Sequence, residues 1–364
     1  MATSPRKRRN VAGRQGTAPT ISDVAKLAGV SPMTVSRVIN ADSNVRETTR
    51  EAVNEAIARL NYSPNPAARS LAGAGQRRVA LLYSNPSAAY LSEFLVGSLD
   101  QASRSDVQLI VEKCDIGDHE IEVAEHLIKT GIDGMILPSP LCDSPDLLQI
   151  LIDEKVPAVS VGAGRPVAEL HAVSIDEQAA ARAMTRHLIN LGHQRIGFII
   201  GSPKQTASGQ RLDGYLSALE EAGIARDDKL IAQGFFSYRS GLDAAETLLD
   251  QEVPPTAIFA SNDDMAAASV AVAHRKGIDV PGDLTVCGFD DTALATAIWP
   301  ELTTIHQPIA DMSRAAVELI VSTLRAKPKA PKQAIRHLQV DYTLVRRQSD
   351  AAPRRRPGGR LLSA

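Results

Sequence analysis

Cysteine, aromatic residues and long apolar runs are all scarce in this sequence of 364 residues. Its three cysteines, Cys114, Cys142 and Cys287, follow neither the spacing of a metal site nor that of a disulfide framework, so we expect reduced thiols that pack in a core. No apolar run is long enough to span a membrane, and none follows the basic cluster Arg6–Arg9 as it does in a signal peptide. These absences predict a cytoplasmic protein with no membrane segment.

Motifs that mark common enzyme sites are missing as well. The sequence has no Gly-x-Ser-x-Gly elbow and no phosphate-binding loop, and the stretch Gly162–Gly164 lacks the third glycine of a dinucleotide-binding fingerprint. The eight histidines show no metal-ligand spacing. We therefore expect neither an enzyme nor a bound cofactor or metal.

Charge is distributed unevenly along the chain. The whole sequence carries a net charge of −2, yet residues 1–78 contain 13 Lys and Arg against 5 Asp and Glu, and the remainder is acidic. This asymmetry predicts that a basic amino-terminal module binds a polyanion and that the acidic body binds something else.

The basic module contains two short helical segments around a tight turn. We expect a first helix over Ile21–Ala28 that Thr20 caps, a stop at Gly29, and a second helix that Ser31 caps and Pro32 begins. Such a pair places the amino-terminal end of the second helix in a DNA major groove.

A third helix is expected over Glu47–Leu60, because its apolar residues recur at helical spacing on one face. Pro64 and Pro66 interrupt any continuation of this helix. The segment that follows, up to Gly73, can form two helical turns at most, and a helix that short is marginal alone in water. We expect it to become ordered only when a partner holds it.

From Val79 onward, short apolar strands alternate with amphipathic helical segments. This alternation predicts parallel sheets with right-handed crossovers, and nine or more strands favour two lobes with a boundary near Ser174–Asp176. The expected fold is thus a small all-α helix-turn-helix headpiece plus an α/β core of two doubly wound parallel-sheet lobes.

At this point the sequence closely resembles the LacI/GalR family of bacterial transcription regulators over nearly all of Thr20 to Arg347. Four landmarks carry the resemblance: Asp23-Val24-Ala25 through Ser36-Arg37-Val38-Ile39-Asn40, Leu60-Asn61-Tyr62-Ser63-Pro64-Asn65, Ser261-Asn262-Asp263, and Gly288-Phe289-Asp290-Asp291 followed by Leu302-Thr303-Thr304-Ile305. The resemblance implies a DNA-binding headpiece, a hinge helix, and a core like that of periplasmic sugar-binding proteins, which acts as a homodimer.

The candidate DNA contacts fall into three groups. Short polar groups that can reach phosphates and set the register are Thr20, Ser31, Thr34, Ser36 and Asn40. The resemblance implies base contacts by Pro32, Met33 and Arg37, of which Arg37 can bind a guanine edge with two hydrogen bonds. It also implies that Leu71 inserts into the minor groove and kinks the operator. Ile21, Asn44 and Ala68 are further candidate DNA contacts outside these three groups.

The candidate effector contacts lie where the strands of the core end. The resemblance assigns Arg211, Asn262, Asp290 and Gln307 to a small ligand, and Phe236 to stacking on a sugar face. Arg211 and Asp290 together suit a polyhydroxylated ligand, since charged hydrogen bonds to hydroxyl groups are strong and directional. Ser84 is the candidate from the first lobe, where Pro138 and Gly162 stand in place of the Asn and Asp of some relatives, and Asn85, Tyr90 and Ser139 are alternatives to it.

The expected domain boundaries follow from these assignments. They are a disordered basic arm (1–18), a headpiece (19–62), a hinge helix and linker (63–76), a two-lobed core (77–347) and a disordered tail (348–364). Within the core we assign about 77–174 and 305–325 to the first lobe, and about 176–300 and 326–345 to the second.

The sequence therefore predicts a regulator that represses a carbohydrate operon. It is expected to bind a pseudo-palindromic double-stranded operator under control of a sugar-type effector. Two alternatives stay open: a ligand-dependent activator, and a sugar-binding protein without a regulatory role. The tail carries no leucine heptads, so a homodimer is expected rather than a tetramer.

Overall fold

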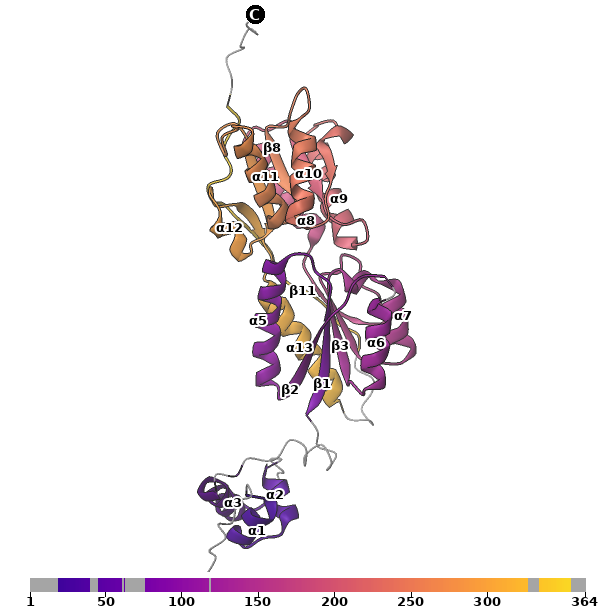
Figure 1. Ribbon diagram of the computed structural model, residues 1–364, viewed down its shortest axis with the longest axis vertical. Helices are drawn as coiled ribbons and strands as arrows, with labels where there is room; N and C mark the ends of the chain where they lie inside the picture. The colour runs from indigo at the N-terminus through magenta and orange to yellow at the C-terminus, as the bar shows by residue number, and fades with distance from the viewer. Residues whose placement is uncertain are drawn as a thin grey trace, which may run out of the picture. The chain divides into compact units, whose positions relative to one another are not determined.

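The computed structural model describes residues 19–39, 45–60, 62, 76–117, 119–326 and 334–354. The chain divides into two compact units, Met1–Gln76 and Arg77–Ala364 (Figure 1). In the described part of the chain, every helix is too short or too polar to cross a membrane.

The first unit contains three helices: α1 (Ile21–Ala28), α2 (Pro32–Ile39) and α3 (Glu47–Leu60). These bounds match the expected helices. Val24, Val35 and Val53, one from each helix, are completely buried and form the centre of the small core. Burial of three aliphatic side chains contributes about 1.5–3 kcal/mol each relative to exposed side chains.

The turn between α1 and α2 has the chemistry that the sequence predicted. Gly29 adopts a left-handed φ of 69°, which glycine reaches without steric cost, and its N–H donates to the Ala25 carbonyl. The Ser31 hydroxyl then accepts the Thr34 N–H at 3.1 Å and so caps α2. At the start of α1, the Asp23 carboxylate accepts the Thr20 N–H at 2.8 Å.

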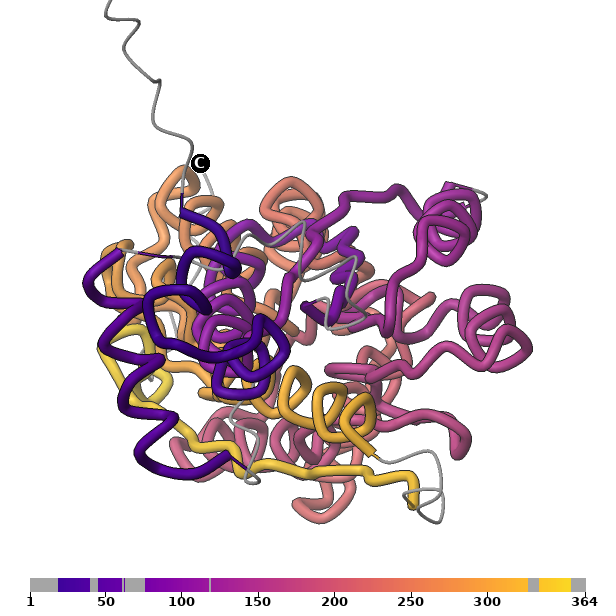
Figure 2. The backbone as a smooth tube through the Cα atoms, turned by 90° about the horizontal axis from the view of Figure 1, so that it is seen from below, coloured from indigo at the N-terminus to yellow at the C-terminus, as the bar shows by residue number. Residues whose placement is uncertain are grey.

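The first lobe of the second unit is a six-stranded parallel sheet in the order β11-β5-β4-β3-β1-β2. Its strands are β1 (Arg77–Tyr83), β2 (Val107–Lys113), β3 (Gly134–Pro138), β4 (Ala158–Val161), β5 (His171–Ser174) and β11 (His337–Gln339). Helices α5 (Ala88–Arg104) and α13 (Ile309–Arg325) cover one face, and α6 (His119–Lys129) and α7 (Pro145–Asp153) cover the other, with the short η1 (Leu141–Asp143) (Figures 1 and 2).

Alternation along β1 explains why this sheet is buried on both faces. Val79 and Leu81 pack into the cluster that contains α5 and α13, whereas Ala80 and Leu82 pack into the cluster under α6 and α7. All four side chains are completely buried. An unbroken apolar run of this kind is what a central strand of a parallel sheet requires.

The second lobe is a six-stranded sheet in the order β12-β10-β9-β8-β6-β7, parallel except for β12. Its strands are β6 (Ile196–Ile200), β7 (Ile231–Gln233), β8 (Ala257–Ala260), β9 (Thr285–Asp290), β10 (Thr303–His306) and β12 (Thr343–Val345). Its helices are α8 (Glu177–Asn190), α9 (Thr206–Glu221), α10 (Tyr238–Leu249), α11 (Asp263–Arg275) and the short α12 (Ala293–Ala297), with η2 (Asp228–Leu230).

The last strands correct the expected assignment of segments to lobes. The first-lobe assignment of about 305–325 holds for α13, with only residues 305–306 of β10 in the second sheet, whereas β11 pairs with β5 in the first sheet although 326–345 was assigned to the second lobe. The chain therefore passes between the lobes three times, after β5, β10 and β11. Strand periodicity does not reveal which sheet edge a strand joins, and this is why the expectation was wrong.

The expected tail is also partly ordered. Ser349 is completely buried, and its hydroxyl donates to the Val286 carbonyl at 2.6 Å while accepting the Thr303 N–H at 2.8 Å. The Asp350 carboxylate contacts His187 at 2.9 Å. Residues 348–354 are thus part of the second lobe rather than disordered, because specific polar partners outweigh a composition typical of disorder. Residues 355–364 lie outside the described part of the chain.

Candidate functional site

The exposed face of α2 carries all three candidate base-contacting residues. Pro32, Met33 and Arg37 are exposed, with 66% of the Met33 side chain accessible, whereas Val35 and Val38 on the opposite face are buried. This face of α2 therefore presents an apolar side chain and a cation to the surface.

The candidate phosphate contacts surround the amino-terminal ends of α1 and α2. Thr20 and Ser31 are exposed, and Thr34 and Ser36 are half-buried. Ile21 is half-buried against the core of the headpiece. Four other candidates, Asn40, Asn44, Ala68 and Leu71, lie outside the described residues.

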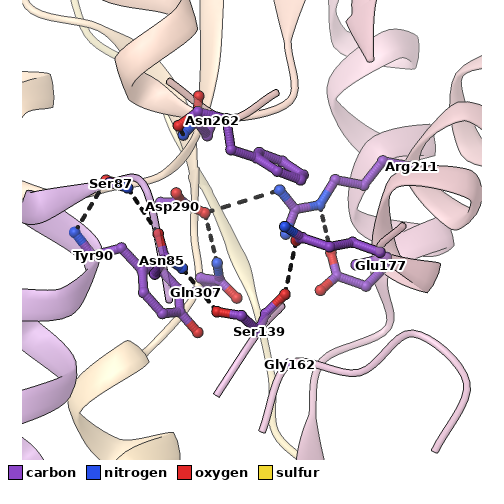
Figure 3. A pocket seen from close by; sticks show the side chains of 13 residues that line it. Asn85, Ser87, Tyr90, Ser139, Gly162, Glu177, Arg211, Asn262, Asp290 and Gln307 are labelled. Carbon is purple, nitrogen blue, oxygen red and sulfur yellow. Dashed lines mark hydrogen bonds and ion pairs between the residues drawn. The ribbon is translucent and has the colours of Figure 1, made fainter. Parts of the chain in front are cut away.

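A pocket lies between the two lobes of the second unit, beside the carboxyl ends of the strands (Figure 3). This is where ligands bind in parallel α/β sheets. The residues before the first crossover that line it are Asn85, Ser87, Tyr90, Ser139 and Gly162. Those after it are Glu177, Gln205, Ala207, Arg211, Phe236, Asn262, Asp290 and Gln307.

Five of the six candidate effector residues therefore meet in one place: Arg211, Phe236, Asn262, Asp290 and Gln307. Ser84 does not line the pocket, whereas its neighbours Asn85 and Ser87 do. The strand β1 ends at Tyr83, and the chain turns into α5 through residues 84–87. A shift of one residue in such a turn changes which side chain faces the cleft.

Arg211, on the first turns of α9, is the most constrained side chain in the pocket. Its Nε donates to the Glu177 carboxylate at 2.7 Å and its Nη1 to the Ser261 carbonyl at 2.5 Å. Its guanidinium carbon lies 3.6 Å from the centre of the Phe289 ring. Burial alone lowers the pKa of Arg211, but the charges of Glu177 and Asp290 outweigh burial and raise it. Arg211 is therefore a fixed cation.

Asp290 ends β9 with its carboxylate aimed at the pocket (Figure 3). Its φ of 110° lies in a region that L-residues rarely adopt, and strain of this kind is often retained at functional sites. Its Oδ1 accepts the Gln307 amide at 2.6 Å and lies 4.0 Å from Arg211 Nη1. Burial raises the pKa of Asp290 well above its usual value, although the charge of Arg211 opposes the shift.

Asn262 and Phe236 support one another across two loops. The Asn262 Oδ1 caps α11 by accepting the Met265 N–H at 3.0 Å, and its Nδ2 donates to the Phe236 carbonyl at 3.0 Å. Phe236 has a positive φ of 58°, and its ring lies so close to Gly201 that a Cβ there would be 2.0 Å from it. Asn262 thus fixes the backbone at Phe236 as well as lining the pocket.

Hydrogen bonds join the two lobes around the pocket. The Ser139 hydroxyl donates to Gln205 Oε1 at 2.8 Å, and the Ser87 hydroxyl donates to the Asp264 carboxylate at 2.6 Å. The Asp143 carboxylate accepts both the N–H and the hydroxyl of Thr206, at 3.0 and 2.7 Å. These contacts connect the two lobes directly around the pocket.

Glu177, Gln205, Ser87 and Ala207 are pocket residues that the sequence analysis missed. Glu177 had one available signal: it opens the helix that follows the first crossover, where a carboxylate at the first helical position faces the cleft. The glutamine and the serine carried no signal, because such residues are common in any loop. Among the described residues, no three or more His, Cys, Asp or Glu side chains are arranged to hold a metal ion.

Comparisons with known proteins agree with this geometry. Residues 20–65 match the model of bacterial regulatory proteins of the lacI family, and residues 185–349 match a periplasmic binding protein-like domain. The chain is 35% identical over 319 residues to the HTH-type transcriptional regulator DegA of Bacillus subtilis, covering 87% of this chain and 94% of that protein. It is 34% identical over 303 residues to catabolite control protein A of Priestia megaterium, covering 83% and 91%.

Solved structures give the same result. A complex of the transcriptional regulator CelR with cellobiose has 33% identity and a TM-score of 0.69 over 91% of this chain and 99% of that chain. The lac repressor dimer bound to operator and the anti-inducer ONPF has 26% identity and a TM-score of 0.75 over 92% and 100%. These relatives are transcriptional regulators rather than enzymes. The chain therefore belongs to the LacI family of DNA-binding transcriptional regulators.

Proposed function

We propose that this regulator is a homodimeric repressor of carbohydrate use, released from or held on its operator by a sugar-type effector in the pocket between the lobes. The observation that carries the proposal is the meeting of Arg211, Phe236, Asn262, Asp290 and Gln307 in that pocket. A cation, a carboxylate, two amides and an aromatic face are the groups that sugar hydroxyls and sugar rings require.

Control of DNA binding follows from where the pocket lies. A ligand there contacts both lobes, and the chain crosses between the lobes three times, so binding biases the angle between them. The first strand of the first lobe begins at Arg77, directly after the linker to the headpiece. A change in lobe angle then alters the spacing of the two linkers in a dimer. Coupling of this kind is usually worth about 1–3 kcal/mol.

On DNA, we propose that Arg37 reads a base and that Leu71 inserts into the minor groove. The exposure of Pro32, Met33 and Arg37 on α2 supports base contacts at this helix end. Replacement of Arg37 by alanine should lower specific affinity by about 1–3 kcal/mol and relax selectivity at one base pair. Arg59→Ala removes an equally charged exposed side chain from α3 and is the matched control.

Dimerisation is supported by apolar side chains exposed on one side of the first lobe. Val96 and Leu99 of α5 are 59% and 54% exposed, and Val111 of β2 is 36% exposed. An apolar group of this kind is typical of an interface between subunits. Two headpieces would then reach half-sites about 34–36 Å apart.

The test begins by selecting operators from a library of pseudo-palindromic duplexes and measuring their affinity by fluorescence anisotropy. Each selected duplex is then titrated with and without a panel of sugars. The proposal predicts an effector that changes operator affinity about 5-fold to 150-fold. The Arg211→Met variant should still bind the operator but lose this response. Failure to prefer any duplex over random competitor at modest ionic strength would contradict the proposal.

A further inference from the structure

Acidic side chains outnumber basic ones among the described residues that line the pocket. Among the described residues that line it, Arg211 is the one cation, and Glu177 and Asp290 are carboxylates. All three side chains are nearly inaccessible, with 6%, 1% and 6% of their surface exposed. The remaining polar lining consists of neutral amides and hydroxyls, such as Gln205, Gln307 and Ser139.

Glu177 forms an ion pair with Arg211 within the protein. Its carboxylate oxygen lies 2.7 Å from Arg211 Nε, while the nearest oxygen of Asp290 lies 4.0 Å from Nη1. Nη1 is itself bonded to the Ser261 carbonyl, and one face of the guanidinium is covered by Phe289. The cation is therefore neutralised and fixed before any ligand arrives (Figure 3).

Further carboxyl groups lie around the pocket. Asp264 accepts the Ser87 hydroxyl, and Asp143 accepts the two Thr206 donors, where the lobes meet. Asp263, at the start of α11, accepts hydrogen bonds from Thr292 and Thr304. The charges of Asp263 and Asp264 contribute, after burial, to the raised pKa of Asp290. A phosphate or carboxylate entering the pocket would lose its hydration and meet Glu177 and Asp290 in the lining, where the Arg211 charge is already paired.

We infer that Glu177 is a specificity-determining residue that restricts the pocket to ligands without negative charge, so that unmodified sugars bind and phosphorylated or acidic sugars are rejected. The inference rests on the proposed function only in treating the pocket as the effector site. Asp290 accepts hydroxyl donors of the ligand, and Phe236 covers an apolar ring face. A ligand phosphate would need to pair with Arg211, which already forms an ion pair with Glu177.

The first experiment uses inorganic phosphate as the anion probe and the melting temperature of the full-length protein as the readout. Sodium chloride at equal ionic strength is the reference. Glu177→Gln removes one negative charge beside Arg211, and the double variant Glu177→Gln with Asp290→Asn removes both. Asp213→Asn is the matched control, because it removes an exposed carboxylate of α9 that does not line the pocket and leaves the Arg211–Glu177 pair intact.

The native protein and the control should respond to phosphate no more than to chloride. Glu177→Gln should gain stabilisation by phosphate, and the double variant should gain more, with apparent phosphate affinity at least about tenfold tighter than that of the native protein. Stabilisation of the native protein by phosphate as large as that of the double variant would overturn the inference. So would folded variants that gain nothing.

A second experiment needs no variant. Isothermal titration of the native protein compares glucose with glucose 6-phosphate, ribose with ribose 5-phosphate, and cellobiose with cellobionic acid. In any pair that binds, the neutral member should bind at least about tenfold more tightly. Tighter binding of the charged member would overturn the inference.

These outcomes separate the inference from the proposed function, since neither experiment involves DNA. A neutral sugar that binds the pocket without changing operator affinity contradicts the proposed function and leaves the charge selectivity in place. A sugar phosphate that binds the native pocket more tightly than its neutral partner and changes operator affinity contradicts the charge selectivity and supports the proposed function.

Discussion

Gly164 lies in the first lobe where the backbone of the second lobe leaves no room for a side chain. A Cβ at this position would lie 2.7 Å from the Ala207 nitrogen and 2.8 Å from the Thr206 carbonyl carbon. The next residue, Arg165, donates its N–H to the Thr206 hydroxyl at 3.1 Å. The absence of a side chain at Gly164 thus permits the close contact that completes the pocket wall at Ala207.

Replacement of Gly164 by alanine should therefore destabilise the core by about 1–3 kcal/mol. Either the backbone strains to accept the methyl group, or the lobes separate and lose the Asp143–Thr206 hydrogen bonds. Urea unfolding measures the loss. Gly209→Ala is the control, because a Cβ there meets nothing within 4 Å and alanine favours the α9 helix. A Gly164 variant as stable as this control would show that the lobes do not meet as described.

At the residue scale, the sequence predicted the charged members of the pocket better than the neutral ones. Asp290 lies within the landmark Gly288–Asp291, the family resemblance assigns Arg211 to the ligand, and both line the pocket. Gln205 could not be found in this way, because its role depends on Ser139, 66 positions earlier in the chain. Contacts across a cleft depend on three-dimensional proximity that neither periodicity nor a local motif encodes.

At the scale of single elements, local chemistry was sufficient for the helices of the headpiece. Caps at Thr20 and Ser31, a left-handed glycine at Gly29 and apolar spacing in α3 fixed the three helices at their observed bounds. The segment after β12 was wrongly expected to be disordered, since its arginines and prolines are typical of mobile tails. Its order depends on Ser349 and Asp350, whose partners lie on β9, β10 and α8.

Ser349→Ala should accordingly lower the free energy of unfolding by about 1–3 kcal/mol. The substitution leaves the Val286 carbonyl and the Thr303 N–H without the serine hydroxyl that now pairs with both. Chemical denaturation of the full-length protein is the measurement. As a control, Ser217→Ala removes a hydroxyl that bonds only to its own helix, at the Asp213 carbonyl, and should change little. Equal stability of the two variants would mean that the segment does not stabilise the lobe.

At the scale of the whole molecule, two buried histidines predict how stability depends on pH. Burial lowers the pKa of His193, although the Ala351 carbonyl at 2.9 Å opposes the shift, and burial also lowers the pKa of His171. His193 further faces Thr256 at 2.8 Å, and the nearby charges are those of Asp350 and His187. His171 lies near Arg336 and His337.

A histidine with a lowered folded-state pKa takes up its proton more readily in the unfolded chain. Its contribution to stability is therefore complete above about pH 6.5, the unfolded value, and decreases as the pH falls below it. Between pH 7.5 and pH 5.5 the melting temperature of the native protein should fall more steeply, or rise less, than that of the His193→Gln variant, because Asp263 and Asp290, whose pKa values burial raises, act in the opposite direction in both proteins. Equal slopes for the two proteins would contradict the assignment of a neutral buried His193.

The arrangement of the lobes was predictable in part. The alternation of strands and helices predicted two parallel sheets, and the boundary expected near Ser174–Asp176 coincides with the first crossover between β5 and α8. The second crossover, after β10, lies close to the expected position, but the last was assigned incorrectly, because β11 has three residues and joins a sheet whose other strands lie more than 160 positions earlier. A strand that short has no pattern of its own, so only tertiary pairing decides which lobe it joins.

The last prediction concerns the subunit interface proposed on α5 and β2. Leu99 is 54% exposed, so Leu99→Lys should fold normally but place a charge in a dimer contact. We expect monomers in analytical ultracentrifugation and a loss of operator affinity of about 100-fold or more, since each headpiece then binds its half-site alone. Val253→Lys, at an apolar side chain of the second lobe with 59% exposure, should remain dimeric and bind normally. Because the effector pocket lies within one chain, the Leu99 variant should keep its affinity for the effector, and a dimeric Leu99 variant with full operator affinity would place the interface elsewhere.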